Sequence, residues 1–257
     1  MIGECRWNES NLRSMNKQVL PYVELGMEKK EQVTKMFNSI ASRYDMMNSL
    51  LSFGIYNYWK WKLVAELKQD KPKLILDVAT GTADIAIALL KLNPEKIIGG
   101  DISAAMIASG EKKITQLAAP KKIELQIADA EQLPFSNNMF DAVTVAYGVR
   151  NFGNLELGLS EMFRVLKPAG KVVILEFSKP RNKFIKRFFN FYFNNICPLL
   201  GKLITGNKSA YTYLPASVKV FPDGEQFENI LQSVGFLKTK CTTLSFGIAT
   251  LYTGYKS

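Results

Sequence analysis

The stretch that decides the fold is residues 73–84, KLILDVATGTAD, in which an apolar run ends at the carboxylate of Asp77 and enters a turn. The turn stays narrow enough for a ligand to lie against its backbone because it is built from three small residues, Ala79, Gly81 and Ala83. A second apolar run, residues 96–101, KIIGGD, ends in another acid, Asp101. The two acids are therefore predicted at the carboxyl edge of one parallel sheet, where α/β folds bind ligands.

Apolar runs alternate with helical patterns along the rest of the chain. Further strands are predicted at residues 123–128, 141–146, 171–177, 237–244 and 248–256. The alternation predicts a doubly wound, mostly parallel, seven-stranded sheet of the Rossmann-like α/β class. Only Ser245, Phe246 and Gly247 separate the last two runs, which predicts a hairpin with one strand antiparallel to the rest. Pro168 and Gly170 are predicted to stop the helix before the fifth strand and to turn the chain.

The chain divides into an extension and one domain. Residues 1–30 show no clear periodicity and are predicted to be an extension, followed by a single domain over residues 31–257. Within that domain, residues 31–70 have helical spacing and are expected to cover the ligand edge of the sheet. Residues 180–220 form an aromatic and basic insert.

Composition limits the chemistry. The 257 residues carry a formal net charge of +10, which suggests an acidic partner such as nucleic acid, an anionic membrane or a phosphorylated ligand, or serves solubility alone. The chain contains no histidine, and its cysteines are scattered, so no metal site and no disulfide framework is predicted. The first residues have no apolar segment of signal-peptide length. We therefore expect a cytoplasmic protein whose thiols are reduced: Cys5, Cys197 and Cys241.

The turn after Asp77 distinguishes between nucleotide cofactors. The phosphate-binding pattern G-x-x-x-x-G-K-[ST] does not occur, and ATGTAD stands where a dinucleotide fingerprint would have three glycines. Asp84 would repel a pyrophosphate at this turn, whereas S-adenosylmethionine (SAM) carries a sulfonium and an ammonium group that acids attract. Asp101 alone decides little, because a carboxylate there binds a ribose in NAD enzymes too, or caps the helix that begins near Ser103. Asp129 and Ala130 follow the third strand, where they would receive an adenine ring or form an ordinary loop.

Two long segments carry a family resemblance. Residues 44–59, YDMMNSLLSFGIYNYW, and 164–180, RVLKPAGKVVILEFSKP, resemble the signature segments of the ubiquinone/menaquinone biosynthesis C-methyltransferases, a family of class I SAM-dependent methyltransferases. DVATGTAD, DISAAM, ADAEQLPF and AYGVRNF are similar to its other motifs, and the likeness runs from Phe37 to Tyr255. The chain departs from the family pattern at four positions: Ala79, Ala83 and Ala169, which replace glycines, and Tyr56, which replaces His or Gln.

The resemblance implies SAM as cofactor and a polyprenylated hydroquinone as substrate. Asp77 and Gly81 belong to the cofactor turn, and the family's SAM contacts fall on four residues: Thr82, Asp101, Asp129 and Ala130. The implied reaction methylates a ring carbon next to a phenolic hydroxyl, which must lose its proton for the carbon to attack. Candidate catalytic residues are Arg150 and Asn151 after the fourth strand, together with Tyr44 and Asp45 from the preceding helices. Arg150 would stabilise a phenolate, although it would equally suit a structural pairing with an acid.

Demethylmenaquinol is the expected substrate, and a benzoquinol of the ubiquinone pathway is the alternative. Residues 178–195, SKPRNKFIKRFFNFYFNN, are suited to an anionic membrane surface, to the isoprenoid tail, or to a surface helix with a buried aromatic face. Peripheral membrane association is therefore expected. A nucleic-acid methyltransferase is disfavoured because AYGVRN replaces the N-P-P-Y-like turn of amino-methylating enzymes. A non-catalytic SAM-fold protein of a quinone-synthesis complex and a homodimer are left open.

Overall fold

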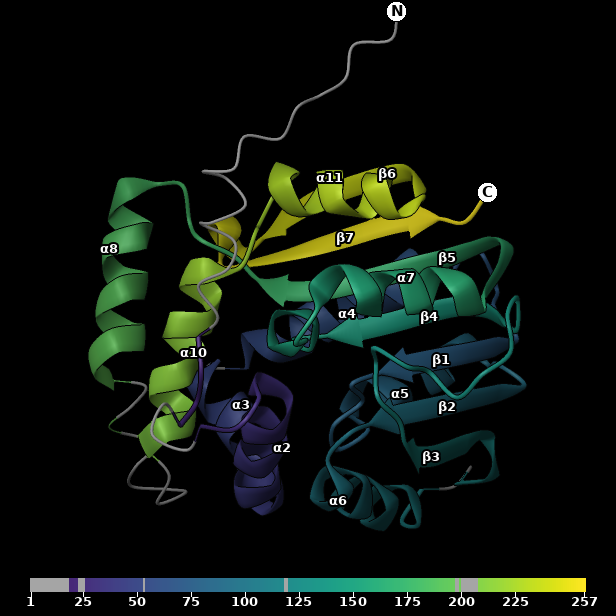
Figure 1. Ribbon diagram of the computed structural model, residues 1–257, viewed down its shortest axis with the longest axis horizontal. Coiled ribbons are helices and arrows are strands. Elements are labelled where there is room, and N and C mark those ends of the chain that lie inside the picture. Colours follow the sequence, from purple (N-terminus) through teal and green to yellow (C-terminus); the bar gives the residue numbers. More distant parts are fainter. Residues whose placement is uncertain (1–18, 23–25, 53, 118–119, 197–198, 200–207) are drawn as a thin grey trace, which may run out of the picture.

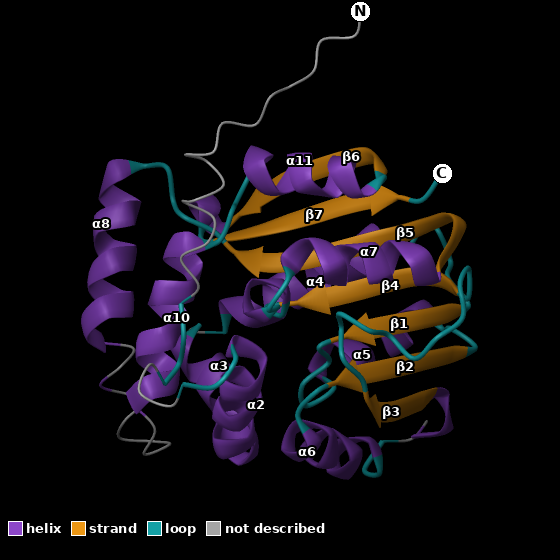
Figure 2. Ribbon diagram, viewed as in Figure 1, coloured by secondary structure: helices purple, strands orange, loops and turns teal. Residues whose placement is uncertain are grey.

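The computed structural model describes residues 19–22, 26–52, 54–117, 120–196, 199 and 208–257. Most of the predicted extension, residues 1–18 and 23–25, lies outside the described residues, as do Cys5 and Cys197. The described chain forms one seven-stranded sheet flanked by helices (Figures 1 and 2). The strands are β1 (Leu74–Val78), β2 (Lys96–Asp101), β3 (Ile123–Ile127), β4 (Phe140–Ala146), β5 (Leu166–Phe177), β6 (Leu237–Leu244) and β7 (Ala249–Tyr255).

The order of the strands is β3-β2-β1-β4-β5-β7-β6. Strands β1 to β5 pair in parallel, whereas β7 runs antiparallel to both β5 and β6. The short turn η7 (Ser245–Gly247) joins β6 to β7. The predicted sheet and its antiparallel hairpin strand are therefore confirmed.

The start of β5 differs from the prediction. Helix α7 (Leu155–Val165) is followed at once by strand structure at Leu166, and the predicted turn at Pro168 and Gly170 lies inside β5. The pairing with β4 skips from Leu166 to Lys171, and Ala169 between them has a φ of +62°. The intervening residues bulge out of the sheet, and the N–H of Ala169 bonds to the carbonyl oxygen of Lys256 at 2.9 Å. This bond to the segment after β7 keeps the turn attached to the edge of the sheet.

Helices cover both faces of the sheet and its carboxyl edge. They are α2 (Lys29–Ile40), η2 (Ala41–Arg43), α3 (Tyr44–Leu51), α4 (Ile55–Glu66), α5 (Asp84–Leu89), η3 (Leu90–Leu92), α6 (Ala104–Ile114), η4 (Pro120–Lys122), η5 (Val149–Asn151), α7, α8 (Lys183–Phe191), the π-helical turn η6 (Tyr192–Ile196), α10 (Lys208–Val220) and α11 (Glu225–Val234).

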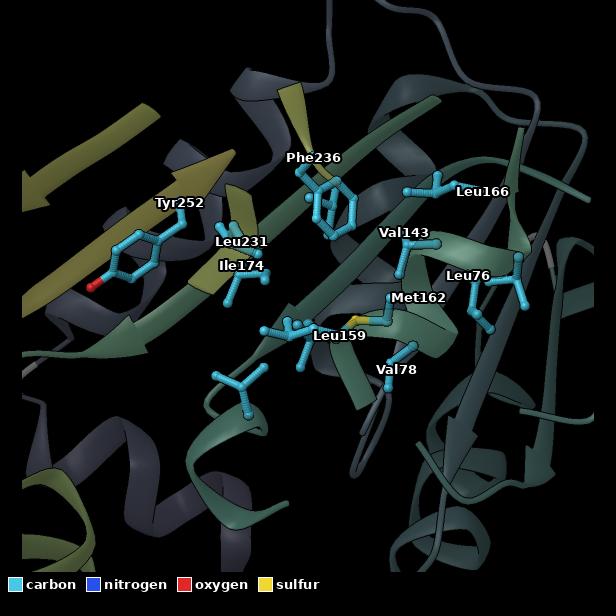
Figure 3. Close-up of a cluster of buried hydrophobic side chains, with 14 of the residues drawn as sticks. Leu76, Val78, Val143, Leu159, Met162, Leu166, Ile174, Leu231, Phe236 and Tyr252 are labelled. Carbon is cyan, nitrogen blue, oxygen red and sulfur yellow. The ribbon is translucent and has the colours of Figure 1, made fainter. Parts of the chain in front are cut away.

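Alternation along the strands separates two apolar layers. In β5, Val172 and Ile174 face the layer that holds α7 and α11, whereas Val173 and Leu175 face the layer that holds α4 and α5. Figure 3 shows the first layer, in which side chains of the two helices interlock with those of the central strands. Because these strands are buried on both faces, they read as continuous apolar runs in the sequence.

A third apolar cluster lies beyond the carboxyl ends of the parallel strands. It joins α2 and α3 to the aromatic side chains of Phe189, Phe193 and Tyr213. Figure 1 shows α2, α3, α8 and α10 on the side to which the arrows of β1 to β5 point. These helices lie over the ligand edge of the sheet, and α2 and α3 form one wall of the pocket described next. None of the described helices is long and apolar enough to cross a membrane.

Candidate active site

A pocket of about 680 Å³, part of it open to solvent, lies at the carboxyl edge of the sheet. Its floor comes from the turns after the parallel strands, and α2 and α3 close it from above. Six of the ten residues predicted for the site line this pocket: Tyr44, Gly81, Asp101, Asp129, Ala130 and Asn151. The other four lie outside its lining: Asp45, Asp77, Thr82 and Arg150.

Asp101 holds the turn and faces the pocket at the same time. Its Oδ2 accepts the N–H of Gly81 at 2.9 Å, and its Oδ1 accepts the N–H of Ser103 at 2.8 Å. Burial raises the pKa of this carboxyl, although the backbone N–H donors oppose the rise. The Ser103 hydroxyl itself caps α6 through the N–H of Met106. The acid therefore supports the helix start and still presents its charge to the pocket.

Asp77 lies beneath the turn. Its two oxygens accept the hydroxyls of Thr80 and Thr144 at 2.6 and 2.7 Å, and only 1% of the residue is exposed. Burial raises the pKa of its carboxyl to about 6. The expected direct contact with a cofactor has no support in this position, since Asp77 binds the residues that shape the turn.

Thr82 and Asp45 lie in a charged cluster beside the turn. The Thr82 hydroxyl donates to Asp45, and Lys113 Nζ lies 2.7 Å from Asp45 and 2.8 Å from Asp84. Lys60 Nζ lies 3.0 Å from the other oxygen of Asp84. Burial raises the pKa of Asp84, but its bonds to the two lysines outweigh burial and hold the pKa below its ordinary value. The charge of Asp84 is thus balanced within the protein and does not line the pocket.

Asp129 and Ala130 form the pocket wall after β3. Asp129 Oδ1 accepts the N–H of Glu131 at 2.9 Å, and its Oδ2 lies 2.5 Å from Lys30 Nζ. Lys30 comes from α2, so this ion pair ties the helical cover to the floor of the pocket. Each carboxylate oxygen keeps a further lone pair for a donor on a ligand.

Tyr44 stands opposite the turn after β1. Its ring would lie 3.9 Å from a Cβ placed on Gly81, and it meets the ring of Phe37 edge to face with centroids 6.0 Å apart. Burial raises the pKa of the Tyr44 hydroxyl, while a hydrogen bond to Asn48 and the charge of Arg150 act in the opposite direction. Its position favours a contact with a flat ligand over proton removal.

Arg150 lies in η5 and forms a buried ion pair with Glu176 at the end of β5. Its Nη1 lies 2.9 Å from Glu176 Oε1 and also donates to the carbonyl of Tyr147. Glu176 is fully buried, and burial raises its pKa against the opposing charge of Arg150. Asn151 donates from Nδ2 to the same carbonyl of Tyr147 at 3.2 Å. The ion pair and the shared carbonyl fix the turn after β4 at the edge of the pocket.

Lys29 secures this turn from the cover. Its Nζ donates to the carbonyl oxygens of Arg150 and Phe152 at 3.1 and 2.7 Å. Burial lowers the pKa of Lys29 to about 8, with Glu131 raising it and Arg150 lowering it further. Together with Lys30, it attaches the start of α2 to two different turns of the sheet.

Several residues of the site were not predicted. Glu176 is an acid inside the apolar run KVVILEF, and a buried acid needs a cationic or hydrogen-bonding partner. This signal would have identified it as the partner of a buried cation. Lys29 and Lys30 look like surface lysines in the sequence, and Tyr147 looks like a strand-end aromatic residue. Tyr213 gives no local signal, because only the tertiary packing of α10 against η5 brings it to the site.

Comparison with known proteins supports a common ancestry over most of the chain. The model of the ubiE/COQ5 methyltransferase family matches residues 26–256. The chain is 46% identical to a demethylmenaquinone methyltransferase of Bacteroides fragilis, over 93% of this chain and 97% of that protein. It is 44% identical to a ubiquinone/menaquinone biosynthesis C-methyltransferase of Geobacter sulfurreducens, over 89% of this chain and 90% of the relative.

Solved structures agree at the level of the fold. A SAM-dependent methyltransferase of Thermotoga maritima superposes with a TM-score of 0.58 at 17% identity, covering 87% of this chain and 99% of that one. Human N-acetylserotonin methyltransferase, solved in complex with SAM, gives a TM-score of 0.60 at 16% identity, with 97% and 65% covered. The family match, the two relatives and the shared fold lead to one conclusion: the chain belongs to the ubiE/COQ5 methyltransferase family.

Proposed function

We propose that the protein uses SAM to methylate a ring carbon of a polyprenylated hydroquinone, with demethylmenaquinol as the favoured substrate. Relatives from Bacteroides fragilis and Porphyromonas gingivalis are both demethylmenaquinone methyltransferases, at 46% and 39% identity. Relatives from Geobacter sulfurreducens and Geotalea daltonii are ubiquinone/menaquinone biosynthesis C-methyltransferases, which keeps a benzoquinol of the ubiquinone pathway as the second candidate. The observation that carries the proposal is the pocket, in which an acidic cofactor wall adjoins the buried Arg150–Glu176 pair.

The pocket suits SAM better than a phosphorylated nucleotide. Its lining contains three acids, Asp101, Asp129 and Glu131, and one cation, Lys30. That balance favours a ligand with sulfonium and ammonium groups over one with a pyrophosphate. We assign Asp101 to the ribose hydroxyls, and Asp129 with the N–H of Ala130 to the adenine edge. Gly81 lets the cofactor approach the turn, while Asp77 and Thr82 support it from behind.

When bound, SAM would supply an electrophilic methyl group on a positively charged sulfur. The task of the protein is then to present a ring carbon that carries extra electron density. Arg150 places a guanidinium held by Glu176 near the entering ring, where positive charge stabilises a phenolate. Asn151, at the pocket edge, orients the same oxygen, and Tyr44 packs against the ring. Asp45 is bonded to Thr82 and Lys113, which makes it a support for the turn rather than a base.

A methyl-transfer assay tests the proposal directly. The protein is incubated with SAM labelled in its methyl group and with reduced demethylmenaquinol, a demethylated ubiquinol precursor, or RNA. We expect label in the demethylmenaquinol ring. Label in neither quinol would leave the non-catalytic SAM-fold protein as the better description, and label in RNA would overturn the substrate class.

Two substitutions separate the cofactor and substrate halves of the site. Asp101→Asn removes the charge facing the ribose and is expected to raise the dissociation constant of SAM about tenfold. Asn151→Ala should lower kcat about tenfold or more and change SAM affinity little, because it affects only the turn after β4. Equal loss of SAM affinity in both variants would contradict this division of roles.

We also propose that α8 touches an anionic membrane surface. Phe184, Phe188 and Phe191 are 87%, 69% and 57% exposed and follow one another at helical spacing. Exposed basic side chains accompany them on the same helix: Lys183, Lys186 and Arg187. Aromatic groups flanked by basic residues suit the interface of an anionic bilayer, where the tail of a polyprenylated substrate would lie.

A further inference from the structure

Four buried polar atoms gather around the turn after β4 without a hydrogen-bond partner among the described residues. They are the hydroxyls of Tyr147 and Tyr213, Nε of Arg150 and Oδ1 of Asn151. Tyr147 and Tyr213 are 6% and 4% exposed, the Arg150 side chain 7% and Asn151 9%. Leaving a buried polar group without a partner is costly, so these four atoms call for a partner from outside the described chain.

The four groups come from two elements that meet only in the folded chain. Tyr147, Arg150 and Asn151 belong to the turn after β4, whereas Tyr213 lies on α10, which packs against η5. The hydroxyls of Tyr147 and Tyr213 both lie in the field of Arg150 and Glu176, although burial is the main cause of their raised pKa values. Tyr147 and Asn151 also line the cofactor pocket, so the cluster adjoins the place where the methyl group would be delivered.

The backbone at Tyr147 supports a role beyond packing. Tyr147 has a φ of +57°, a conformation that is strained for a bulky residue. Its ring is held between neighbours, with centroids 4.7 Å from Phe177 and 5.7 Å from Tyr56. Strain of this kind persists where surrounding contacts enforce it, and it is concentrated at functional sites.

The chemistry of the cluster selects its ligand. Arg150 Nε–H can only donate, Asn151 Oδ1 can only accept, and the two tyrosine hydroxyls can do either. A carboxylate or phosphate would be repelled by Asn151 Oδ1 and by Glu176, while a quinone carbonyl leaves the acceptor unpaired. A phenolic hydroxyl both donates and accepts. We propose that Tyr213 and Tyr147 position a ring hydroxyl of the aromatic substrate, which Arg150 Nε and Asn151 Oδ1 bind from the other side.

The inference rests on the proposed function and adds a means of recognising the reduced substrate. A hydroquinone satisfies the acceptor of Asn151, whereas the oxidised quinone has no hydrogen to donate. The bound hydroxyl lies next to the positive charge of Arg150, which Glu176 holds in place. Asn151 Oδ1 therefore distinguishes the two redox forms, and Tyr213 and Tyr147 are positioning residues that hold the ring hydroxyl against it.

Two stable probes test the hydroxyl directly, without requiring turnover. 1-Naphthol has a phenolic O–H, and 1-methoxynaphthalene keeps the ring and the oxygen but cannot donate. We expect the wild-type protein to bind 1-naphthol at least about tenfold more tightly, in line with the cost of leaving buried partners unpaired. Tyr213→Phe and Tyr147→Phe should each reduce this preference about fivefold, and Tyr58→Phe, at an exposed tyrosine of α4, should leave it unchanged.

Thermal unfolding of the ligand-free variants separates positioning from structure. Removing an unpartnered hydroxyl should leave the melting temperature of Tyr213→Phe unchanged or higher, whereas a tyrosine with a hidden structural partner would lose stability. A lowered melting temperature together with an unaltered 1-naphthol preference would overturn the proposal. Equal binding of both probes by the wild-type protein would do so as well. Because neither readout uses SAM, failure here is distinguishable from failure of methyl transfer.

Discussion

The buried carboxyl of Asp77 makes the stability of the protein depend on pH. Its pKa is raised to about 6 by burial, against an ordinary value of 3.8, so the folded protein holds this proton over a range where the unfolded chain has lost it. The stability contributed by the protonated form is therefore complete at low pH and is lost as pH rises from about 4 to about 6. Asp77→Asn should remove this loss, which amounts to roughly 3 kcal/mol for a shift of about two units.

Urea unfolding of the wild type and Asp77→Asn at pH 4.5 and pH 7 measures the effect. We expect the free energy of unfolding of Asp77→Asn to rise relative to that of the wild type as pH increases. A constant difference between the two proteins would show that Asp77 has the same pKa folded and unfolded.

Ala79 stores strain at the same turn. It has a φ of +51° without being glycine, a conformation that costs an alanine roughly 1–2 kcal/mol. Ala79→Gly should therefore stabilise the protein by about 0.5–1 kcal/mol after the larger entropy of the unfolded glycine is deducted. Ala83→Gly is the matched comparison, since Ala83 has a φ of +64° but is fully buried, and loss of its methyl offsets the relief. If chemical denaturation showed a larger increase in the free energy of unfolding for Ala83→Gly than for Ala79→Gly, this account would be contradicted.

The residue types of the site could be read from the sequence more easily than their roles. Asp101 and Asp129 lie in the pocket because acids at the ends of parallel strands share one edge, which depends only on strand direction. Asp77 and Thr82 are two and one positions from pocket residues, yet they point elsewhere. The direction of a side chain in a tight turn depends on positive φ values at alanines, for which no local sequence rule exists.

At the element scale, α2 is held over the pocket by its first two residues. Lys29→Met removes two hydrogen bonds to the turn after β4 and should lower the free energy of unfolding by about 1–2 kcal/mol. Lys35→Met, at an exposed lysine of the same helix, is the control and should change little. We expect SAM to bind more weakly to Lys29→Met only, as measured by calorimetric titration.

The lowered pKa of Lys29 adds a second signature. The folded state releases this proton near pH 8, while the unfolded chain retains it to about 10.5, so stability due to Lys29 rises with pH between these values. The difference between the wild type and Lys29→Met should therefore widen above pH 8. A stability difference that does not change with pH would indicate that the Lys29 amino group is exposed to water in the folded protein.

Strand directions were predictable because the hairpin connection is three residues long, and so short a link can only reverse the chain. The bulge at the start of β5 could not be predicted, because Pro168 and Gly170 are equally typical of an ordinary turn between a helix and a strand. What retains this segment in the sheet is the bond from Ala169 to Lys256, two residues 87 positions apart in the chain. Local patterns contain no information on such a partner.

At the scale of the whole molecule, the exposed face of α8 should govern membrane binding. In flotation with phosphatidylglycerol vesicles, we expect the wild type to bind at low salt and to be released as salt rises. The double variant Phe184→Ser, Phe188→Ser should bind about tenfold more weakly, whereas Leu157→Ser, at an exposed position of α7, should bind like the wild type. Vesicle binding that survives the double substitution would point to another surface.

The position of β7 determines when the sheet can be completed during synthesis. Residues 249–255 leave the ribosome after all the other strands, yet they lie between β5 and β6. Until then, β5 presents an unpaired apolar edge and β6 has no neighbour at all. The nascent chain thus has a period in which strand pairing with other molecules competes with its own folding, and the duration of that period depends on translation of the last hairpin.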